Sequence, residues 1–328
     1  MKLGVYTAIL HDRALPEALA TIKGLGLTGA EINAGGFLPP VHLPVDDVLS
    51  SDDAAGDYLG LFDEAGVELT GLNANGNPLH PDPRIGPVHA ADLRRTIEAA
   101  GRLGVPRVVA MSGLPAAEAG GTVPAWNPMP FESTYLHARD RQWAEVGVPF
   151  WREIDALARD HDVRVCLEMH QFNLVFNPAT LERLVEQTAA THLGAEMDPS
   201  HLFWQGIDPV AAIEHLGPLV FHAAAKDTRI NPAALVHGVL DDRHREVTED
   251  PIRLGGDATL SAWPENPAWD FVALGKGHDQ DFWTRFLRAL AKIDPDMAVN
   301  IEHEDVELGQ LEGLEVAARV LLAAAGEV

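Results

Sequence analysis

Apolar residues occur along the chain in short runs that alternate with longer amphipathic segments. Short apolar runs are typical of parallel strands buried on both faces, and the segments between them carry apolar residues at helical spacing. This pattern predicts eight strands, which are expected at residues 2–9, 27–34, 67–75, 105–112, 163–169, 193–198, 219–224 and 298–303.

The segments between the strands also begin and end with residues that are typical of helix ends. Segment 16–26 begins with proline and ends with glycine, and segment 91–104 again ends with glycine. Proline suits the first helical turn because its missing N–H would have no partner there, and glycine readily adopts the left-handed conformation that ends a helix. Segments 282–290 and 313–322 carry apolar residues at helical spacing.

This regular alternation predicts an α/β protein with a (β/α)8 barrel, also called a TIM barrel. The competing open sheet would normally carry a glycine-rich phosphate-binding loop after its first strand, and the sequence has none there. A chain of 328 residues is within the usual size of one such barrel. We therefore expect a single domain over residues 1–328.

Two long insertions interrupt the alternation, at about 113–148 after strand four and about 228–280 after strand seven. In a barrel, loops that follow strands lie on the C-terminal face, where active sites are built. Loops of this length are usually either functional or disordered. Trp263 and Trp269 favour order in the second one, because tryptophan is seldom left in water. We expect both insertions to cover a substrate.

Strands five to eight each end in a potential metal ligand: Glu168, Asp198, His222 and Glu302. Any one of these residues could instead be a helix cap or a solvated charge. Four such tips on consecutive strands, however, would converge in a closed barrel. Three carboxylates and one imidazole suit a hard-to-borderline divalent cation, with Mn²⁺ preferred and Mg²⁺, Co²⁺ or Zn²⁺ as alternatives.

Other side chains are positioned to contact an oxygen-rich substrate. His201 follows Asp198 by one helical turn, and Lys226 follows His222 by four residues. The simpler interpretations are a helix-start histidine without a role and a solvated ion pair between Lys226 and Asp227. Weaker candidates for substrate binding are His80, Trp126, His170 and His278, with Glu31 and Glu304 as further carboxylates near strand ends.

Composition narrows the class of partner. With 24 basic and 49 acidic residues, the formal net charge is −25, which disfavours nucleic acid and anionic membrane surfaces. The one cysteine, Cys166, excludes an intrachain disulfide, and no apolar run approaches the roughly 20 residues of a membrane span. We expect a cytoplasmic homo-oligomer that acts on a small molecule.

Four motifs together resemble a known family. They are Cys-Leu-Glu-Met-His at 166–170, Asp-Pro-Ser-His at 198–201, the histidine followed by Lys-Asp within 222–227, and Ile-Glu-His-Glu at 301–304. In this respect the chain is similar to the xylose-isomerase-like sugar phosphate isomerase/epimerase superfamily over nearly its whole length. Members of that superfamily include ketose epimerases, inosose and hydroxypyruvate isomerases, keto-sugar eliminases and a DNA-repair endonuclease.

The resemblance implies a divalent metal held by Glu168, Asp198, His222 and Glu302. It also implies that the two glutamates act as the acid/base pair on opposite faces of a sugar, with His201 bonded to the substrate. The predicted function is therefore an isomerase or epimerase of a keto-sugar or related polyol, which transfers a proton through a metal-stabilised enediolate. An arginine that the epimerases carry after the metal histidine would fall near Thr228 or Arg229.

Three alternatives remain open. The nearest is a metal-dependent eliminase, or lyase, that acts on 3-keto-glycosides and resembles family members with a small second subunit. An endonuclease is disfavoured, because it would need more histidines at strand ends and a basic groove. A non-catalytic sugar-binding barrel would tolerate the loss of a ligand, and the sequence retains all four candidates.

Overall fold

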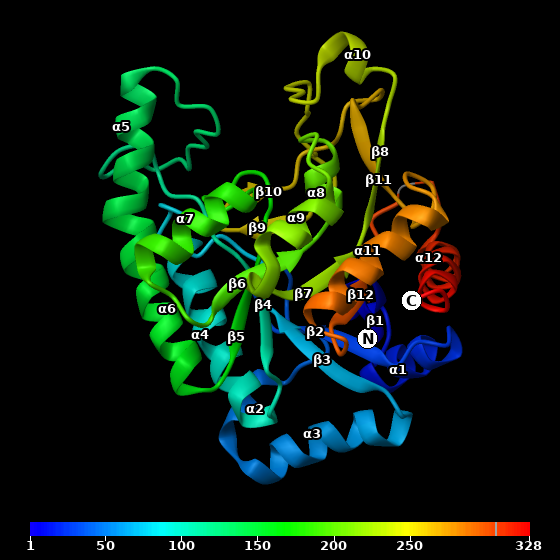
Figure 1. The fold of residues 1–328 in the computed structure, drawn as a ribbon. Coiled ribbons are helices and arrows are strands. Elements are labelled where there is room, and N and C mark those ends of the chain that lie inside the picture. Colours follow the sequence, from blue (N-terminus) through cyan, green and yellow to red (C-terminus); the bar gives the residue numbers. More distant parts are fainter. Residues whose placement is uncertain (306) are drawn as a thin grey trace.

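Eight parallel strands close into a barrel in the computed structural model, which describes residues 1–305 and 307–328 (Figure 1). Around the barrel the strands follow the order β1-β12-β7-β6-β5-β4-β3-β2. Their bounds are β1 (Lys2–Tyr6), β2 (Gly29–Asn33), β3 (Glu68–Asn73), β4 (Arg107–Met111), β5 (Arg164–Glu168), β6 (Leu193–Met197), β7 (Val220–Ala225) and β12 (Ala298–Ile301). The predicted (β/α)8 barrel is confirmed.

All eight predicted strands are present, and most of them are shorter than expected. The largest shift of a single boundary is at the first strand, where the expected 2–9 ends at Tyr6 and residues Thr7–Leu10 form the 3-10 helix η1. Leu10 is fully buried in that helix. Apolar residues continue past the end of the strand because they pack in the core, and a short apolar run does not distinguish strand from helix.

Helices pack around the outside of the barrel, as Figure 1 shows. They are α1 (Leu15–Gly24), α2 (Val45–Ser50), α3 (Asp52–Ala65), α4 (Gly86–Leu103), α6 (Val148–Asp160), α7 (Pro178–Thr188), α9 (Pro209–Leu216), α11 (Gln280–Ile293) and α12 (Gln310–Ala325). A glycine ends helix α4 as expected, since Gly104 directly follows the helix and adopts a left-handed φ of 68°. Helix α7 starts with a capping box between Asn177 and Thr180.

Residues that alternate along each strand separate an apolar shell from a polar interior. Ala223 and Ala225 of β7 belong to the main apolar core, which includes the helices, whereas His222 is fully buried and pairs with carboxylate and amide side chains. Inside the barrel, β2 and β12 contribute Glu31 and Asn300, both buried. Polar side chains inside the barrel can hold other side chains in place at its C-terminal end.

The two insertions project from the same side of the barrel (Figure 1). The first contains α5 (Ser133–Arg141), which has no buried residue. In the second, β8 (Asp227–Ile230) and β11 (Trp269–Val272) form an antiparallel pair, and α10 (Ala234–His237), β9 (Arg253–Gly255) and β10 (Ala258–Thr259) lie between them. The second insertion therefore has its own secondary structure.

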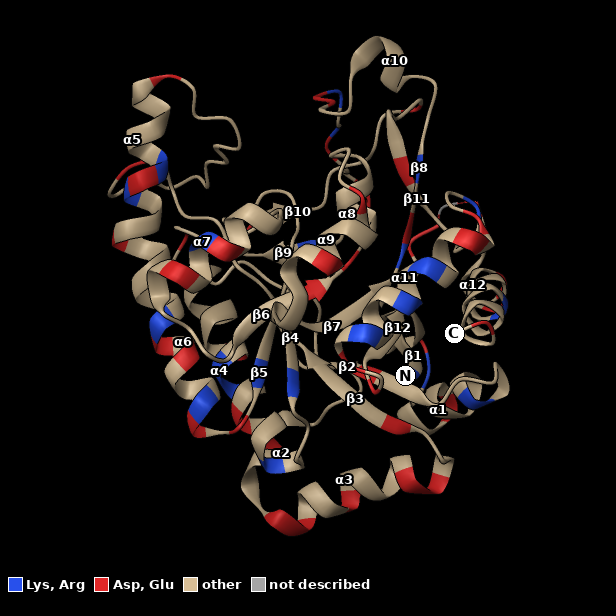
Figure 2. Cartoon of the chain, viewed as in Figure 1, with Lys and Arg blue, Asp and Glu red and all other residues tan. Residues whose placement is uncertain are grey.

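Charged residues are distributed over the outer helices, and acidic ones predominate on α3 (Figure 2). Among the residues that the structure describes, no helix combines the length and the apolar character that crossing a membrane would require.

Candidate active site and metal centre

Three of the predicted ligands meet at the C-terminal end of the barrel. Glu168 is the last residue of β5, and Asp198 and Glu302 directly follow β6 and β12. One carboxylate oxygen from each of the three lies within 4.8 Å of the others. Glu168 and Asp198 are buried, and the Glu302 side chain is 16% exposed, so the group can be reached from one side.

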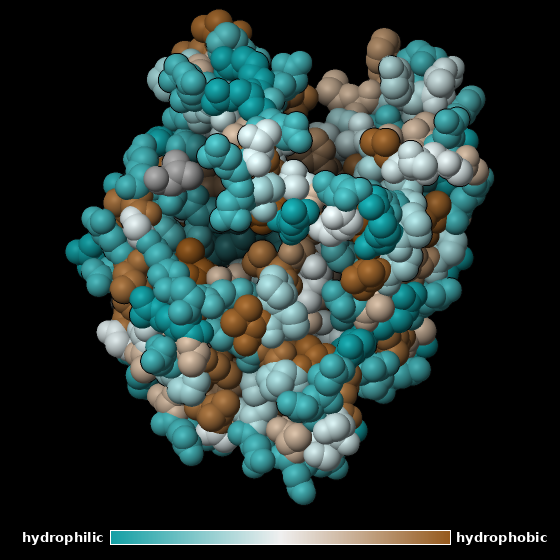
Figure 3. Space-filling view, turned by 180° about the vertical axis from the view of Figure 1, so that it is seen from behind, coloured by the Kyte–Doolittle hydropathy of each residue, from teal (hydrophilic) through white to brown (hydrophobic). Residues whose placement is uncertain are grey.

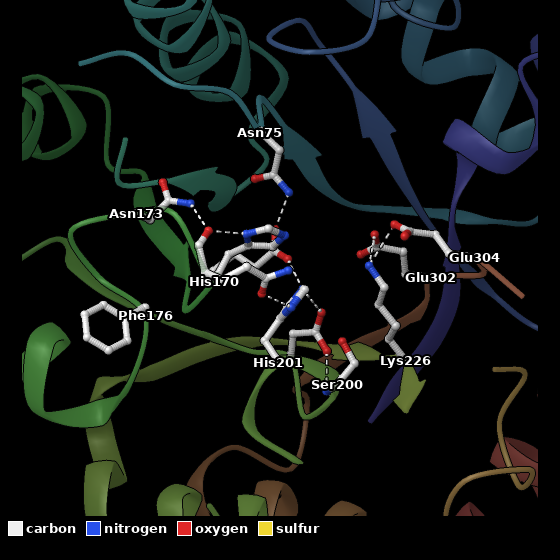
Figure 4. A network of polar contacts seen from close by, with 12 residues as sticks. Asn75, His170, Asn173, Phe176, Ser200, His201, Lys226, Glu302 and Glu304 are labelled. Atoms are coloured by element: carbon white, nitrogen blue, oxygen red, sulfur yellow. Dashed lines mark hydrogen bonds and ion pairs between the residues drawn. The ribbon is translucent and has the colours of Figure 1, made fainter. Parts of the chain in front are cut away.

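His201 points its Nε2 into this group (Figure 4). The nitrogen lies 2.9 Å from Oε1 of Glu168 and 3.2 Å from Oδ2 of Asp198. Neither contact has hydrogen-bond geometry, so His201 Nε2 and Asp198 Oδ2 are buried polar atoms without a partner. Buried polar atoms are rarely left unpaired, and a converging set of oxygen and nitrogen atoms suits a divalent cation. The residues present therefore fit a metal.

Neighbouring side chains fix the orientation of these donors. Gln171 Oε1 lies 2.9 Å from Nδ1 of His201, and the backbone N–H of Ser200 donates to Asp198 Oδ1 at 2.8 Å. Asn75, just beyond β3, donates to Oε2 of Glu168. Such partners orient metal ligands and hold them in place.

The carboxylates and the imidazole shift one another's pKa. Burial lowers the pKa of His201, but Asp198 and Glu168 outweigh it and raise the value to about 9. Burial likewise opposes ionisation of Asp198, yet His201 brings its pKa down to about 2. The pKa of Glu302 lies well above its ordinary value because of burial, an effect that Lys226 opposes. Glu168 has a lowered pKa, since His201 and His170 outweigh its burial.

Lys226 lies beside the third carboxylate. Its Nζ donates to Oε1 of Glu302 at 2.7 Å and to Oε1 of Glu304 at 2.8 Å (Figure 4). The ammonium group also lies 4.4 Å from the centre of the Phe271 ring. Burial would lower the pKa of Lys226, but Glu302 and Glu304 raise it well above its ordinary value. Lys226 is therefore a fixed positive charge at the edge of the site.

His222 occupies a different position from the one that the sequence suggested. Its Nε2 lies 2.8 Å from Oε2 of Glu31, and its ligand atoms group with Glu31 and Glu196, not with the three carboxylates. The reason is depth in the barrel. Strand β7 continues to Ala225, opposite Ile301, so His222 is not at the tip, whereas Glu168 ends its strand. We therefore correct the expectation that His222 completes the carboxylate group.

His170 and His278, two other histidines predicted to bind a substrate, are oriented differently with respect to the carboxylate group. His170 packs against His201, with 4.1 Å between the ring centres, and shares a ligand group with Glu168 and His201. His278 is turned away: its Nδ1 lies 2.7 Å from Oδ1 of Asp227 and its ring stacks on Phe203. His170 is thus positioned for substrate or metal, and His278 supports a loop.

His80 and Trp126, the last two residues predicted to contact a substrate, do not lie beside the carboxylate group. His80 accepts a hydrogen bond from the backbone N–H of Asp82 through Nδ1. Trp126 packs on Phe172 and Phe176, which lie in the loop after β5. Trp126 therefore packs with that neighbouring loop and with the cluster of Trp204 and Trp269.

Several supporting residues were absent from the sequence-based set. Asn73 and Asn300 donate to the carboxylate of Glu31, and Glu196 lies beside it with Oε2 unpartnered. Burial, together with the neighbouring Glu31, raises the pKa of Glu196 well above its ordinary value. A signal was present in the sequence, because polar side chains stand at strand positions where a core would place apolar ones.

A cavity of about 1230 Å³ reaches Glu302 and Glu304 from the side of the second insertion. Tyr6, Asn33 and Asn75 line it from the barrel, and the remaining wall comes largely from residues 229–271. Seen from behind, the surface is hollowed below two projecting lobes (Figure 3). A cavity next to a group of perturbed carboxylates is where a substrate would be expected.

Known proteins share this architecture. A family model described as xylose isomerase-like TIM barrel matches residues 19–323. The uncharacterized protein YfiH of Bacillus subtilis (strain 168) is 31% identical over 325 residues, which are 98% of each chain.

Two solved structures illustrate the likeness of fold. The IolI protein with a bound zinc atom is 18% identical, with a TM-score of 0.61 over 100% of this chain and 99% of that one. The 3-keto-D-glucoside 4-epimerase YcjR from E. coli is 14% identical, with a TM-score of 0.60 over 99% of each chain. At these identities the likeness is one of fold.

Proposed function

The chain belongs to the xylose isomerase-like TIM barrel family, and from its site we propose that it is a metal-dependent isomerase or epimerase of a keto-sugar. The observation that carries the proposal is the convergence of Glu168, Asp198 and Glu302, with the unpartnered Nε2 of His201 pointing into the same group. Acidic oxygens and an imidazole around one point suit Lewis-acid chemistry on a substrate rich in oxygen.

We propose Glu168, Asp198, Glu302 and His201 as the residues that hold the metal. This set replaces His222 of the sequence-based expectation with His201. Three carboxylates and one imidazole suit Mn²⁺ first, and the zinc atom in the IolI structure keeps Zn²⁺ as an alternative. When bound, the cation would stabilise negative charge that develops on a substrate carbonyl oxygen.

The two glutamates have the properties of an acid/base pair. The lowered pKa of Glu168 keeps it ionised near neutral pH, so it can accept the proton from the carbon beside the carbonyl. The raised pKa of Glu302 allows it to hold a proton and return one. Two carboxyl groups whose surroundings move their pKa values apart are a frequent arrangement for acid and base roles.

Lys226 would bind and orient the substrate. Its ammonium group is held by Glu302 and Glu304, which line the cavity, so it lies next to the position where a substrate would contact Glu302. A positive charge there favours the ionised form of Glu302 once the proton has been delivered. Glu168 would thus take the proton from carbon, and Glu302 would return one.

The second candidate is an eliminase that acts on 3-keto-glycosides, and the size of the cavity favours it. The first step would be the same removal of a proton beside the ketone. The electron pair would then expel the aglycone from the neighbouring carbon, and the departing oxygen or carbon atom of the aglycone would take up a proton. The small second subunit expected for this reading remains a prediction.

Product analysis in D₂O tests the proposal and separates the two candidates. The Mn²⁺-loaded protein would be incubated with keto-sugars and 3-keto-glycosides, and the products resolved by mass. Carbon-bound deuterium in an isomeric sugar is the expected result, and Glu302→Gln should abolish it. Release of an aglycone without an isomer would instead indicate the eliminase. Absence of both reactions with every substrate, in protein shown to contain metal, would refute the proposal.

A further inference from the structure

A second group of potential ligands lies inside the barrel, apart from the carboxylates of the candidate active site. This inner group consists of Glu31 from β2, Glu196 from β6 and His222 from β7, and each of the three is at most 2% exposed. One ligand atom from each lies within 4.8 Å of the other two. Because β2 lies on the opposite side of the barrel from β6 in the strand order, these side chains meet in the interior.

The inner group is separate from the carboxylates of the candidate active site. Glu196 precedes Asp198 by two residues, and side chains two apart along a strand point to the same side. Two residues of a strand rise about 6–7 Å, which is more than the 4.8 Å that contains the ligand atoms of either group. The cavity beside Glu302 is not lined by any member of the inner group. Each group therefore has the space for a cation of its own.

Negative charge is in excess within the inner group. Glu31 and Glu196 both place a carboxyl group in the interior, and in residues 1–305 and 307–328 neither has a lysine or arginine within ion-pair distance. The imidazole of His222, 2.8 Å from Oε2 of Glu31, can balance at most one of the two charges. Buried carboxylates are unfavourable unless they are paired or coordinate a metal ion. A bound cation would supply the positive charge that the side chains lack.

Two members of the inner group also have unpartnered atoms. Oε2 of Glu196 is buried and has no hydrogen-bond partner, and the same holds for Nδ1 of His222. The two residues lie directly opposite each other on the neighbouring strands β6 and β7. Buried oxygen and nitrogen atoms rarely remain without a partner. Unpartnered atoms on two of three converging side chains therefore indicate a ligand between them.

The third member, Glu31, is held in place by amides. Asn73 Nδ2 donates to its Oε1 at 2.8 Å, and Asn300 Nδ2 donates to its Oε2 at 2.9 Å. The orientation of Asn300 is itself fixed, because Thr70 Oγ1 donates to its Oδ1 at 3.3 Å. Gly4 leaves the space for this amide, since an added Cβ would collide with Oδ1. Partners of this kind orient the ligands of a metal ion.

From the converging atoms, the excess negative charge and the unpartnered Oε2 of Glu196, we infer that Glu31, Glu196 and His222 hold a second divalent cation inside the barrel. Carboxylate oxygens and one imidazole nitrogen in a closed space suit Zn²⁺, which is usually four-coordinate, better than Mg²⁺, which demands octahedral geometry. The role of this cation is structural, because it joins β2 to β6 and β7 across the barrel. The inference goes beyond the proposed function, since it concerns neither the substrate nor the outer ligands.

Zinc content, measured by inductively coupled plasma mass spectrometry, tests the inference. The native protein, dialysed against Zn²⁺ and then desalted, should contain two equivalents. Glu196→Gln keeps the size of the side chain and removes its charge, so it should contain one equivalent fewer. Asp155→Asn is the matched control and should leave the content unchanged. Asp155 is a buried carboxylate of α6 that accepts from the backbone of Thr191 and His192, outside both ligand groups.

Variants of the outer group show which site holds the remaining zinc. Asp198→Asn removes an outer ligand, so it should retain one equivalent, and Zn²⁺ should raise its Tm because the cation binds only the folded protein. The double variant Asp198→Asn/Glu196→Gln should retain none, and its Tm should not respond to Zn²⁺. Folded Asp198→Asn without bound zinc would overturn the inference, whether or not Glu196→Gln folds.

The same measurements separate the inference from the proposed function. A single equivalent in the native protein that is lost in Glu196→Gln and kept in Asp198→Asn would support the inner site and refute the outer metal of the proposed function. Equal zinc content in the native protein and in Glu196→Gln, with folding confirmed by circular dichroism, would overturn the inner site and leave the proposed function intact. The inner group would then be held together by a proton shared between Glu31 and Glu196.

Discussion

At the scale of the residue, Asp198 shows how a buried polar atom without a partner indicates a ligand. Its Oδ1 accepts a hydrogen bond from the backbone of Ser200, but its Oδ2 has none, although the side chain is fully buried. His222 also has an unpartnered atom, Nδ1, but its Nε2 lies 2.8 Å from Oε2 of Glu31, and its ligand atoms group with Glu31 and Glu196 instead of with the three carboxylates. The two residues should therefore respond differently to substitution.

We predict that Asp198→Asn weakens Mn²⁺ binding by at least about 100-fold, because loss of an outer-sphere partner alone usually costs 10–100-fold. His222→Asn should change the affinity far less, since His222 lies deeper in the barrel. Calorimetric titration of metal-free protein with Mn²⁺ measures both, with circular dichroism to confirm folding. An equal loss of affinity in the two variants would return His222 to the ligand set.

Cys166 gives a second prediction at this scale. The thiol is fully buried, and burial raises its pKa, so it stays protonated under mildly alkaline conditions. Because the thiolate is the reactive form, Ellman's reagent at about pH 8 should not label the native protein and should label it fully in denaturant. Rapid labelling of the native protein would show that the strand around Cys166 opens locally.

The sequence predicted well where most strands end, but it predicted poorly how deep in the barrel a residue lies. Glu168, Asp198 and Glu302 were recognisable because an apolar run stops at each of them. His222 also follows apolar residues, but the strand continues through small alanines to Ala225. Alanine is compatible with strand, helix and loop, so the pattern did not show where this strand ends. Only the pairing of β7 with β12 fixed that position.

At the scale of the element, Asp227 connects β8 to the end of the second insertion. Its Oδ2 accepts three backbone hydrogen bonds, from Gly275 at 3.1 Å and from Gly277 and His278 at 3.0 Å each. Glycine is required at 277, since an added Cβ would lie 2.3 Å from the carbonyl oxygen of Thr228. The insertion is therefore fixed at a buried point directly after Lys226.

Asp227→Ala should lower the free energy of unfolding by about 2–4 kcal/mol, because it leaves several buried N–H groups without acceptors. Asp279→Ala is a suitable control: Asp279 caps α11 through the N–H of Phe282, and such a cap is worth about 1 kcal/mol. Urea unfolding measures both. If Asp227→Ala costs no more than the control, the three backbone bonds do not hold the insertion.

Asp305 fixes the segment after β12 in a similar way, and here the effect depends on pH. Its carboxylate accepts from the backbone N–H groups of Ala273, Glu307 and Leu308. Burial opposes ionisation, but these bonds bring the pKa of Asp305 below the ordinary 3.8. A pKa lowered by folding stabilises the protein fully above the unfolded-state value, and that contribution is lost as pH falls through the folded-state value.

Asp305→Ala should therefore be less stable than the native protein by about 1–3 kcal/mol at neutral pH. The difference should shrink as the pH falls below the unfolded-state value near 3.8 and through the lower folded-state pKa, because the native carboxylate then becomes protonated as well. Urea unfolding at a series of pH values measures this. A difference that stays constant across the series would assign the loss to packing instead of to the charged carboxylate.

Elements with regular periodicity were predictable, and those inside the insertions were not. The eight barrel strands and the helices such as α11 follow from apolar spacing and end signals. Strands β8 and β11 did not, because Asp-Thr-Arg-Ile and Trp-Asp-Phe-Val are short and partly polar. They form a pair only because the chain returns after residues 231–268, and such a long-range pairing leaves no local signal.

At the scale of the whole molecule, the fold accounts for where the site lies but not for what it binds. A barrel places the ends of all eight strands at one face, so carboxylates distant in the sequence meet there. The insertion after β7 contributes much of the wall of the cavity beside this site, including Arg229 and Arg243, which are paired with carboxylates. The surroundings of the site therefore depend on a segment whose structure the sequence pattern did not reveal.

The net charge of −25 also acts on the molecule as a whole. Even if each of the 24 basic residues paired with one carboxylate, 49 − 24 = 25 acidic residues would remain without a basic partner. Exposed ion pairs contribute at most about 1 kcal/mol each, whereas repulsion among many like charges opposes the compact state. Repulsion should therefore be the larger of the two effects that salt screens.

We predict that raising NaCl from about 10 mM to about 300 mM increases the Tm of the metal-free protein by several degrees, since the screening length falls from about 30 Å to less than 10 Å. Calorimetry in the presence of a chelator measures this, with sucrose at equal osmolarity as the control for solvent exclusion. Sucrose stabilises through the surface that unfolding exposes and not through charge. A Tm that falls in salt would show that the ion pairs outweigh the repulsion, and an equal rise in both solutes would assign the effect to solvent exclusion.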